Sequence, residues 1–269
     1  MTTGLSTPRH RDMRVQWPWL LVAAAWIVAV GATLTGQRFL IDHHYLLEES
    51  GLPWPLAASV FLIGWQVMIA AMMTPTSIPF ARVALTDLQM DSLSVGRSRR
   101  SLALFFAAYA SVWTTFGLLA FSGDTMIHRA VDVWPWLAAH SYLIGATTLA
   151  LAGLYQFSAW KRVSLARCRA DHAPSTASAV SPMMSPWRLG LRHGLDSVCC
   201  CWTLMLIMFG IGVGGLAWMA ALTLMMVGET ALPGEVRSRR ICRAIGVGLI
   251  VLAGLWLAHP AWLVPATVS

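Results

Sequence analysis

The stretch that decides the fold reads VCCCWTLMLIMFGIGVGGLAWMAALTLMMV, residues 198–227, and it contains no charged residue. A helix that crosses the apolar core of a bilayer needs about 20 residues. This run is therefore too long for a single such helix. Four glycines, Gly210, Gly212, Gly214 and Gly215, stand near its middle. We expect them to divide the run into a tight pair of membrane helices.

The composition of the whole chain points to the same class of protein. Of its 269 residues, 57% are hydrophobic and 12% are charged, and the mean hydropathy is +0.62. A soluble domain carries about a quarter charged residues, so a soluble enzyme, a disordered chain and a disulfide scaffold are excluded. The sequence predicts an all-α, polytopic integral membrane bundle of about seven helices, or six without the glycine break. The seven stretches are 17–36, 54–73, 101–121, 137–157, 197–212, 214–232 and 244–259.

Basic residues predict the orientation of this bundle. Cytoplasmic loops of membrane proteins carry an excess of Lys and Arg, and a cytoplasmic N-terminus places 17 of the 19 basic residues on that side. The net charge of +7 then reflects topology, and no nucleic-acid partner is expected. We predict a basic cytoplasmic tail over 1–16 and a single membrane domain over 17–269, with a cytoplasmic loop at 158–196.

Two further features of the chain concern its non-membrane parts. The first apolar run has about 20 residues and exceeds the 7–15 of a cleaved signal peptide, so we expect it to remain as a helix. Within the long loop, residues 173–186 are small, polar and proline-bearing, which is typical of a flexible linker.

The predicted helices contain few side chains that can carry a charge or transfer a proton. Their interiors contain no Asp, Glu, Lys or Arg, and Glu229 stands at the inner end of the sixth. Intramembrane ionisable residues are the usual sign of proton relays and ion-coupled transport. The sequence also contains no phosphate loop and no nucleophile elbow. We therefore expect no active site of the kind found in soluble enzymes, and whether the protein is an enzyme stays open.

The remaining candidate functional groups are the sulfur atoms of cysteine and methionine. The five cysteines fall on or near the predicted cytoplasmic side, where thiols stay reduced. Three of them, Cys199, Cys200 and Cys201, are consecutive in the first turn of the fifth helix. Since successive helical residues are about 100° apart, at most two of the three should face the bundle.

A second sulfur source lies at the inner end of the second helix. Met68 and Met72 are four residues apart and share a helix face. We expect the segment 74–76, Thr-Pro-Thr, to end this helix at the cytoplasmic interface, which places thioethers and thiols at similar depth. Soft sulfur ligands suit Cu(I), and Zn(II) becomes suitable if His193 joins them. Ordinary core packing of Met and Cys is the alternative.

Three segments resemble a known family, the predicted metal-binding integral membrane proteins of bacteria called domain of unknown function 2182. The segments are Met68–Pro79, Gly153–Arg169 and Gly190–Glu229, and the third is the most distinctive. The resemblance implies a helical protein of the bacterial inner membrane with a metal-binding role and no established reaction.

The chain departs from that family pattern at two expected thiols. Ser164 stands where the family carries the first of two cysteines, and Cys168 keeps the second. Before Cys200, the usual Cys and Gly positions hold Ser197 and Cys199. A hydroxyl is a poor ligand for a soft metal, so these changes are expected to weaken metal binding.

Together these observations predict a non-catalytic inner-membrane protein with a soft-metal site, Cu or Zn, at the cytoplasmic ends of the second and fifth helices. Its expected partners are the lipid bilayer and a small soluble metal-handling protein. Two alternatives stay open: a membrane thiol redox protein that uses the vicinal cysteines, and a structural subunit without a ligand. The candidate metal ligands are Met68, Met72, Cys168, His193, Cys200, Cys201 and Glu229.

Overall fold

The computed structural model describes residues 16–36, 51–88, 95–169, 185–211, 215–231 and 234–259. These residues form helices joined by short connections, with no strand among them, so the predicted all-α class is confirmed. The tail 1–15 and most of the predicted linker, together with Gly212 and Gly214, lie outside the described residues. The helices are α2 (Trp17–Leu34), α4 (Trp54–Met68), the π-helix η3 (Ile69–Met73), α5 (Thr74–Leu88), α6 (Val95–Val133), α7 (Pro135–Ala139), α8 (Tyr142–Tyr155), α9 (Ala159–Cys168), α11 (Pro186–Gly210), α12 (Leu216–Ala231) and α13 (Glu235–Ala258).

Five of these helical segments are long and apolar enough to cross a membrane. Two shorter apolar helices, Tyr142–Tyr155 and Leu216–Thr230, accompany them. The deciding stretch is indeed split, because α11 ends at Gly210 and α12 begins at Leu216. The five long segments are Trp17–Leu34, Trp54–Leu85, Arg99–Val133, Pro186–Gly210 and Glu235–Ala258.

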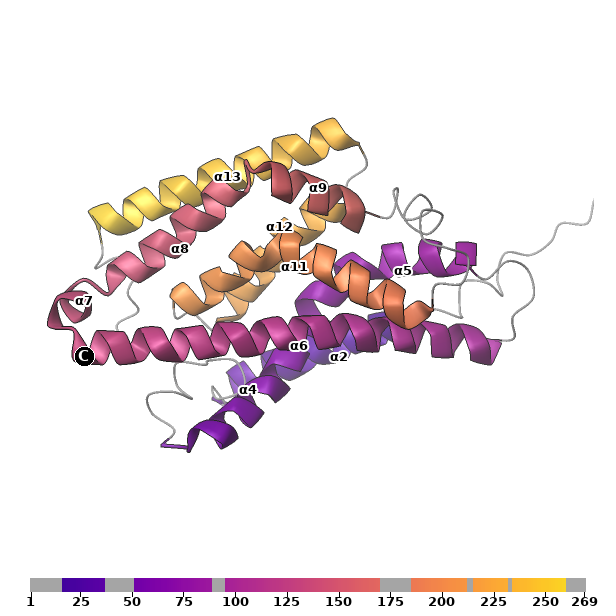
Figure 1. Cartoon of the computed structure of the whole chain (residues 1–269), viewed down its shortest axis with the longest axis horizontal. Coiled ribbons are helices and arrows are strands. Elements are labelled where there is room, and N and C mark those ends of the chain that lie inside the picture. Colours follow the sequence, from indigo (N-terminus) through magenta and orange to yellow (C-terminus); the bar gives the residue numbers. More distant parts are fainter. Residues whose placement is uncertain are drawn as a thin grey trace, which may run out of the picture.

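The helices form one elongated bundle in which α6 runs the full length (Figure 1). Helix α11 packs along α6, and α8 packs along α13. Glycines allow both approaches: a Cβ at Gly190 would overlap the Phe105 carbonyl oxygen, and one at Gly153 would lie 2.9 Å from the Gly246 carbonyl oxygen. Small residues at helix contacts let backbones approach closely in membrane proteins.

The predicted end of the second helix at residues 74–76 is wrong. The helix continues through η3 into α5, which also contains Pro79. Pro75 has no N–H to donate to the carbonyl of Ala71, and the indole of Trp26 on α2 donates to that carbonyl instead, at 3.1 Å. The Thr76 hydroxyl donates to the Met73 carbonyl at 2.7 Å. A side chain from another helix therefore satisfies the carbonyl that Pro75 leaves open.

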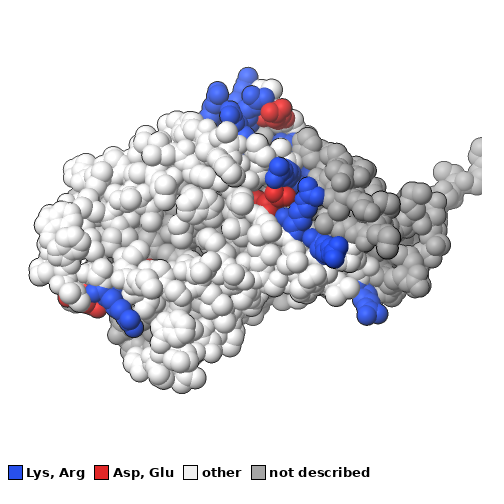
Figure 2. Space-filling view, viewed as in Figure 1, with Lys and Arg blue, Asp and Glu red and all other residues white. Residues whose placement is uncertain are grey.

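Charged side chains are unevenly distributed over the bundle. Figure 2 shows most of the visible Lys and Arg side chains near the end where α9 and the first turns of α11 and α13 lie. A smaller basic patch is visible at the opposite end, and the face between the two is almost free of charge. Residues that could carry a binding site at the basic end therefore lie on α9, α11 and α13.

The contact between α11 and α6 predicts the effect of adding one methyl group. Gly190→Ala should lower the free energy of unfolding by about 1–3 kcal/mol, because the new Cβ meets the fixed backbone of Phe105. The measurement is thermal unfolding in detergent. Gly248→Ala is the control, since no atom lies within 4 Å of a Cβ at Gly248. Equal unfolding temperatures for the two variants would contradict this account of the helix contact.

Candidate metal centre

Helix α9 is short and presents one buried face to α11. The Ser158 hydroxyl caps its start by accepting a hydrogen bond from the backbone N–H of Lys161 at 3.0 Å. Its buried residues are Lys161, Ser164, Leu165 and Cys168. They follow the spacing of a single helix face, and α9 packs against α11. This face brings a lysine and a thiol from one helix to the cysteines of another.

Lys161 joins three helices through its ammonium group. The Nζ atom lies 2.6 Å from Oε2 of Glu229 on α12, and both side chains are fully buried. The same Nζ donates to the backbone carbonyl of Cys200 on α11 at 2.8 Å. A lysine in a buried position must be paired, because an unpaired charge there is very costly. The pair therefore fixes α9, α11 and α12 relative to one another.

Three thiols meet beside this ion pair. Cys168, Cys200 and Cys201 are buried, and Cys199 is exposed, as expected for consecutive helical residues that cannot share one face. The Cys200 side chain is within hydrogen-bond reach of the side chains of both Cys168 and Cys201. The contact with Cys200, and then burial, raise the pKa of the Cys168 thiol well above its ordinary value. At neutral pH a metal ion would have to displace a proton from Cys168.

Glu229 has further neighbours from α8 and α13. The side chains of Gln156 and Cys242 lie against its carboxylate. The Ser238 hydroxyl donates to the Glu229 backbone carbonyl at 3.3 Å. The carboxylate thus lies where α8, α9, α12 and α13 meet, and its nearest cation is Lys161.

His193 lies in an aromatic environment on the same helix as the thiols. Its ring stacks on Phe80 with the centroids 4.1 Å apart, and its Nε2 is 3.1 Å from the Ser77 hydroxyl. Nδ1 is buried without a hydrogen-bond partner among the described residues. The Tyr109 ring also stacks on His193, and its hydroxyl is 2.9 Å from that of Ser197. These contacts hold the imidazole against α5 and α6.

The two candidate methionines lie on a different segment of the same buried core as the thiols. Met72 is fully buried in η3 and Met68 is partly buried at the end of α4. The segment η3 packs against α2, α4, α5 and α12. The structure therefore groups Cys168, Cys200, Cys201 and Glu229 around Lys161, and it places Met68, Met72 and His193 on other contacts.

Lys161 is the central residue that the sequence analysis assigned to a cytoplasmic loop. In the structure it lies on α9, and the exposed fraction of its side chain is zero. A signal was available, because Lys161 stands three residues before Ser164 and seven before Cys168, on the face that carries the thiol. Gln156 and Cys242 were also missed as neighbours of Glu229.

The chemistry of the grouped side chains can be judged from the donor atoms alone. Within the described ranges, no three His, Cys, Asp or Glu side chains are arranged to hold a metal ion together. The three thiols form a chain with Cys200 at its centre. A pair of soft sulfur donors is a good match for Cu(I) and a poor one for hard cations. The donor set therefore fits a copper ion bound by few ligands.

A family model named PpoB2 and described as a copper chaperone matches residues 62–257, from α4 to the end of α13. The chain belongs to this copper chaperone family. The matched region contains all the residues of the thiol and ion-pair cluster. No curated protein and no solved structure matched the chain.

Membership in the copper chaperone family sharpens the earlier resemblance. The expected connection to metal handling is confirmed at the level of the family, and the family that matches carries the name copper chaperone rather than domain of unknown function 2182. Its description agrees with the softness of the donors assembled by α9 and α11.

In this copper chaperone family member, the buried ion pair predicts a double-mutant cycle. Lys161→Met and Glu229→Met should each lower the free energy of unfolding by about 3–5 kcal/mol, because each leaves one buried charge without its partner. The double variant should recover most of that loss. Thermal unfolding of the purified variants in detergent measures all three values.

The control for this cycle is the exposed pair between Arg239 and Glu235, which lies at 2.8 Å. Glu235→Gln should change the free energy of unfolding by less than about 1 kcal/mol. If the losses from Lys161→Met and Glu229→Met simply add in the double variant, the two charges do not depend on each other.

Proposed function

We propose that this protein binds Cu(I) as cargo within a membrane, through the thiol of Cys200 together with that of Cys168 or Cys201. The observation that supports the proposal is the meeting of these three buried thiols from α9 and α11. The identity of the metal in this proposal comes from family membership, since the matching model is described as a copper chaperone. The protein is a carrier rather than a catalyst in this proposal.

The surroundings of the thiols suit a copper ion in transit. Two thiolates that bind one Cu(I) carry a single net negative charge, and the Lys161 ammonium provides a positive charge beside Cys200. Burial excludes water and competing hard ligands. Glu229 holds Lys161 in place and is a positioning residue in this proposal rather than a ligand. A soluble metal-handling protein would deliver or receive the ion at the basic end.

We further propose seven membrane spans with the N-terminus in the cytoplasm of a bacterial cell and the protein in its inner membrane. The seven apolar helical segments support the number of spans. The crowding of basic side chains at one end supports the orientation, since cytoplasmic loops carry the excess of Lys and Arg.

The copper proposal predicts a ranking among neighbouring cysteines. Cys200→Ser should weaken Cu(I) binding by more than about 100-fold. Replacing a residue that only orients a metal ligand already lowers metal affinity by about 10–100-fold, and loss of the ligand itself should cost more. Cys168→Ser should weaken it as well. The measurement is Cu(I) affinity of the purified protein by competition with a chelator.

The matched control is Cys199→Ser, next in the chain and exposed, which should leave the affinity unchanged. Met72→Leu should also keep it, since η3 packs against α2, α4, α5 and α12, and so should Met208→Leu. Loss of binding in Met72→Leu alone would add a thioether to the ligand set. Equal affinity in Cys199→Ser and Cys200→Ser would end the copper proposal at this site.

The topology predicts the fate of two fusions. A reporter that fluoresces only in the cytoplasm should be bright when fused after Gly234 and dark when fused after Ser269, because α13 then crosses the membrane once between them. Whole-cell fluorescence, normalised to the amount of fusion protein, gives the answer. Two bright fusions would leave six spans.

A further inference from the structure

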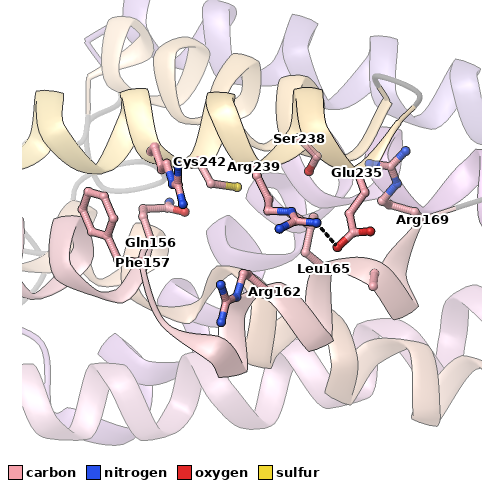
Figure 3. A pocket seen from close by; sticks show the side chains of 11 residues that line it. Gln156, Phe157, Arg162, Leu165, Arg169, Glu235, Ser238, Arg239 and Cys242 are labelled. Atoms are coloured by element: carbon pink, nitrogen blue, oxygen red, sulfur yellow. Dashed lines mark hydrogen bonds and ion pairs between the residues drawn. The ribbon is translucent and has the colours of Figure 1, made fainter.

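A pocket of about 280 Å³ opens between α9 and α13. Figure 3 shows its side chains reaching in from both helices, with Glu235 and Arg239 next to each other. Phe157 and Leu165 give it an apolar part. It is lined by Gln156, Phe157, Arg162, Leu165, Ala166, Arg169, Glu235, Ser238, Arg239, Cys242 and Arg243.

The charge of the pocket is strongly positive. Arg162 contributes from α9, Arg169 from the residue that follows α9, and Arg239 and Arg243 from α13. Among the described residues of the lining, Glu235 is the one carboxylate. Arg239 pairs with Glu235 at 2.8 Å. Arg162 and Arg243 have no carboxylate partner within the described part of the chain. The described lining therefore contains four arginines and one glutamate.

The Arg169 side chain has a fixed position in this pocket, unlike the mobile arginines of an exposed basic surface. Its side chain is only 5% exposed, and its guanidinium lies 3.5 Å from the Gly234 carbonyl oxygen at the start of α13. The arginine is thus held between the two helices before any ligand arrives. A guanidinium fixed in this way loses little conformational entropy on binding an anion.

The pocket also lies at a definite level of the bundle. Residues 244–258 of α13 carry no charge, and the arginines of this helix all precede them. At 1.5 Å per residue, that uncharged part covers about 22 Å of the apolar core of about 30 Å. The arginines therefore lie where the apolar core of a bilayer gives way to the headgroup layer.

We propose that this pocket binds the phosphate headgroup of an anionic phospholipid. Arg162, Arg169 and Arg243 donate to the phosphate oxygens, and guanidinium groups are well suited to such planar, paired hydrogen bonding. The first carbons of the acyl chains lie on Phe157 and Leu165. Basic pockets between membrane helices at the cytoplasmic side bind anionic headgroups in this manner.

A free phosphate offers the same charged group without the acyl chains. The two sources differ in one respect, since the apolar part of the lining can be covered only by a lipid. A lipid also reaches the pocket from within the bilayer, where its local concentration is high.

The experiment measures binding of phosphatidylglycerol to the purified full chain in neutral detergent by native mass spectrometry, with phosphatidylcholine as the reference lipid. The double variant Arg162→Gln, Arg243→Gln should weaken phosphatidylglycerol binding by about 25-fold, since one basic residue near an anionic surface contributes about fivefold. Phosphatidylcholine binding should not change. Inorganic phosphate at equal concentration should not displace the lipid.

Two further variants test whether the effect is specific to the charges that line the pocket. Arg240→Gln removes an exposed charge of α13 that does not line the pocket, and it should change binding by less than about twofold. Glu235→Gln removes the competing carboxylate and should strengthen binding about twofold to fivefold. The proposal is overturned if Arg240→Gln matches the double variant, if Glu235→Gln weakens binding, or if inorganic phosphate displaces the lipid.

Discussion

The buried ion pair between Lys161 and Glu229 is the constraint on which the rest of the site depends. Two opposite charges, 2.6 Å apart and without exposure to solvent, hold α9 and α12 together. The second hydrogen bond of the ammonium, to the carbonyl of Cys200, adds α11. The pair therefore fixes the inner face of α9 against α11, where Cys168 lies beside Cys200.

The sequence predicted the elements of this bundle better than their contacts. The long uncharged runs correctly predicted helices. The expected division of the run 198–227 is also found, since α11 ends at Gly210 and α12 begins at Leu216. The expected end at residues 74–76 failed because Trp26, distant in the sequence, donates to the Ala71 carbonyl that Pro75 leaves open. The sequence placed Lys161 among the basic residues of a loop, because its partner Glu229 is 68 positions away in the chain. Neither long-range contact has a local signature.

The two serines that replace expected thiols have separate roles in the packing. Ser197 lies on α11 one turn before Cys201, and its hydroxyl meets that of Tyr109 on α6. Ser164 is buried on the inner face of α9, between Lys161 and Cys168. Both hydroxyls thus occupy protected positions close to the remaining thiols. The contact between α9 and α11 therefore contains two buried hydroxyls beside three buried thiols.

The distance in sequence between Lys161 and Glu229 also has a consequence for how the protein is made. A ribosome adds about 5–20 residues per second. Glu229 follows Lys161 by 68 positions, so it is added roughly 3–14 s later. During that interval the ammonium of Lys161 lacks the carboxylate of Glu229. A truncated chain that ends before residue 229 contains all three thiols but leaves Lys161 without this partner.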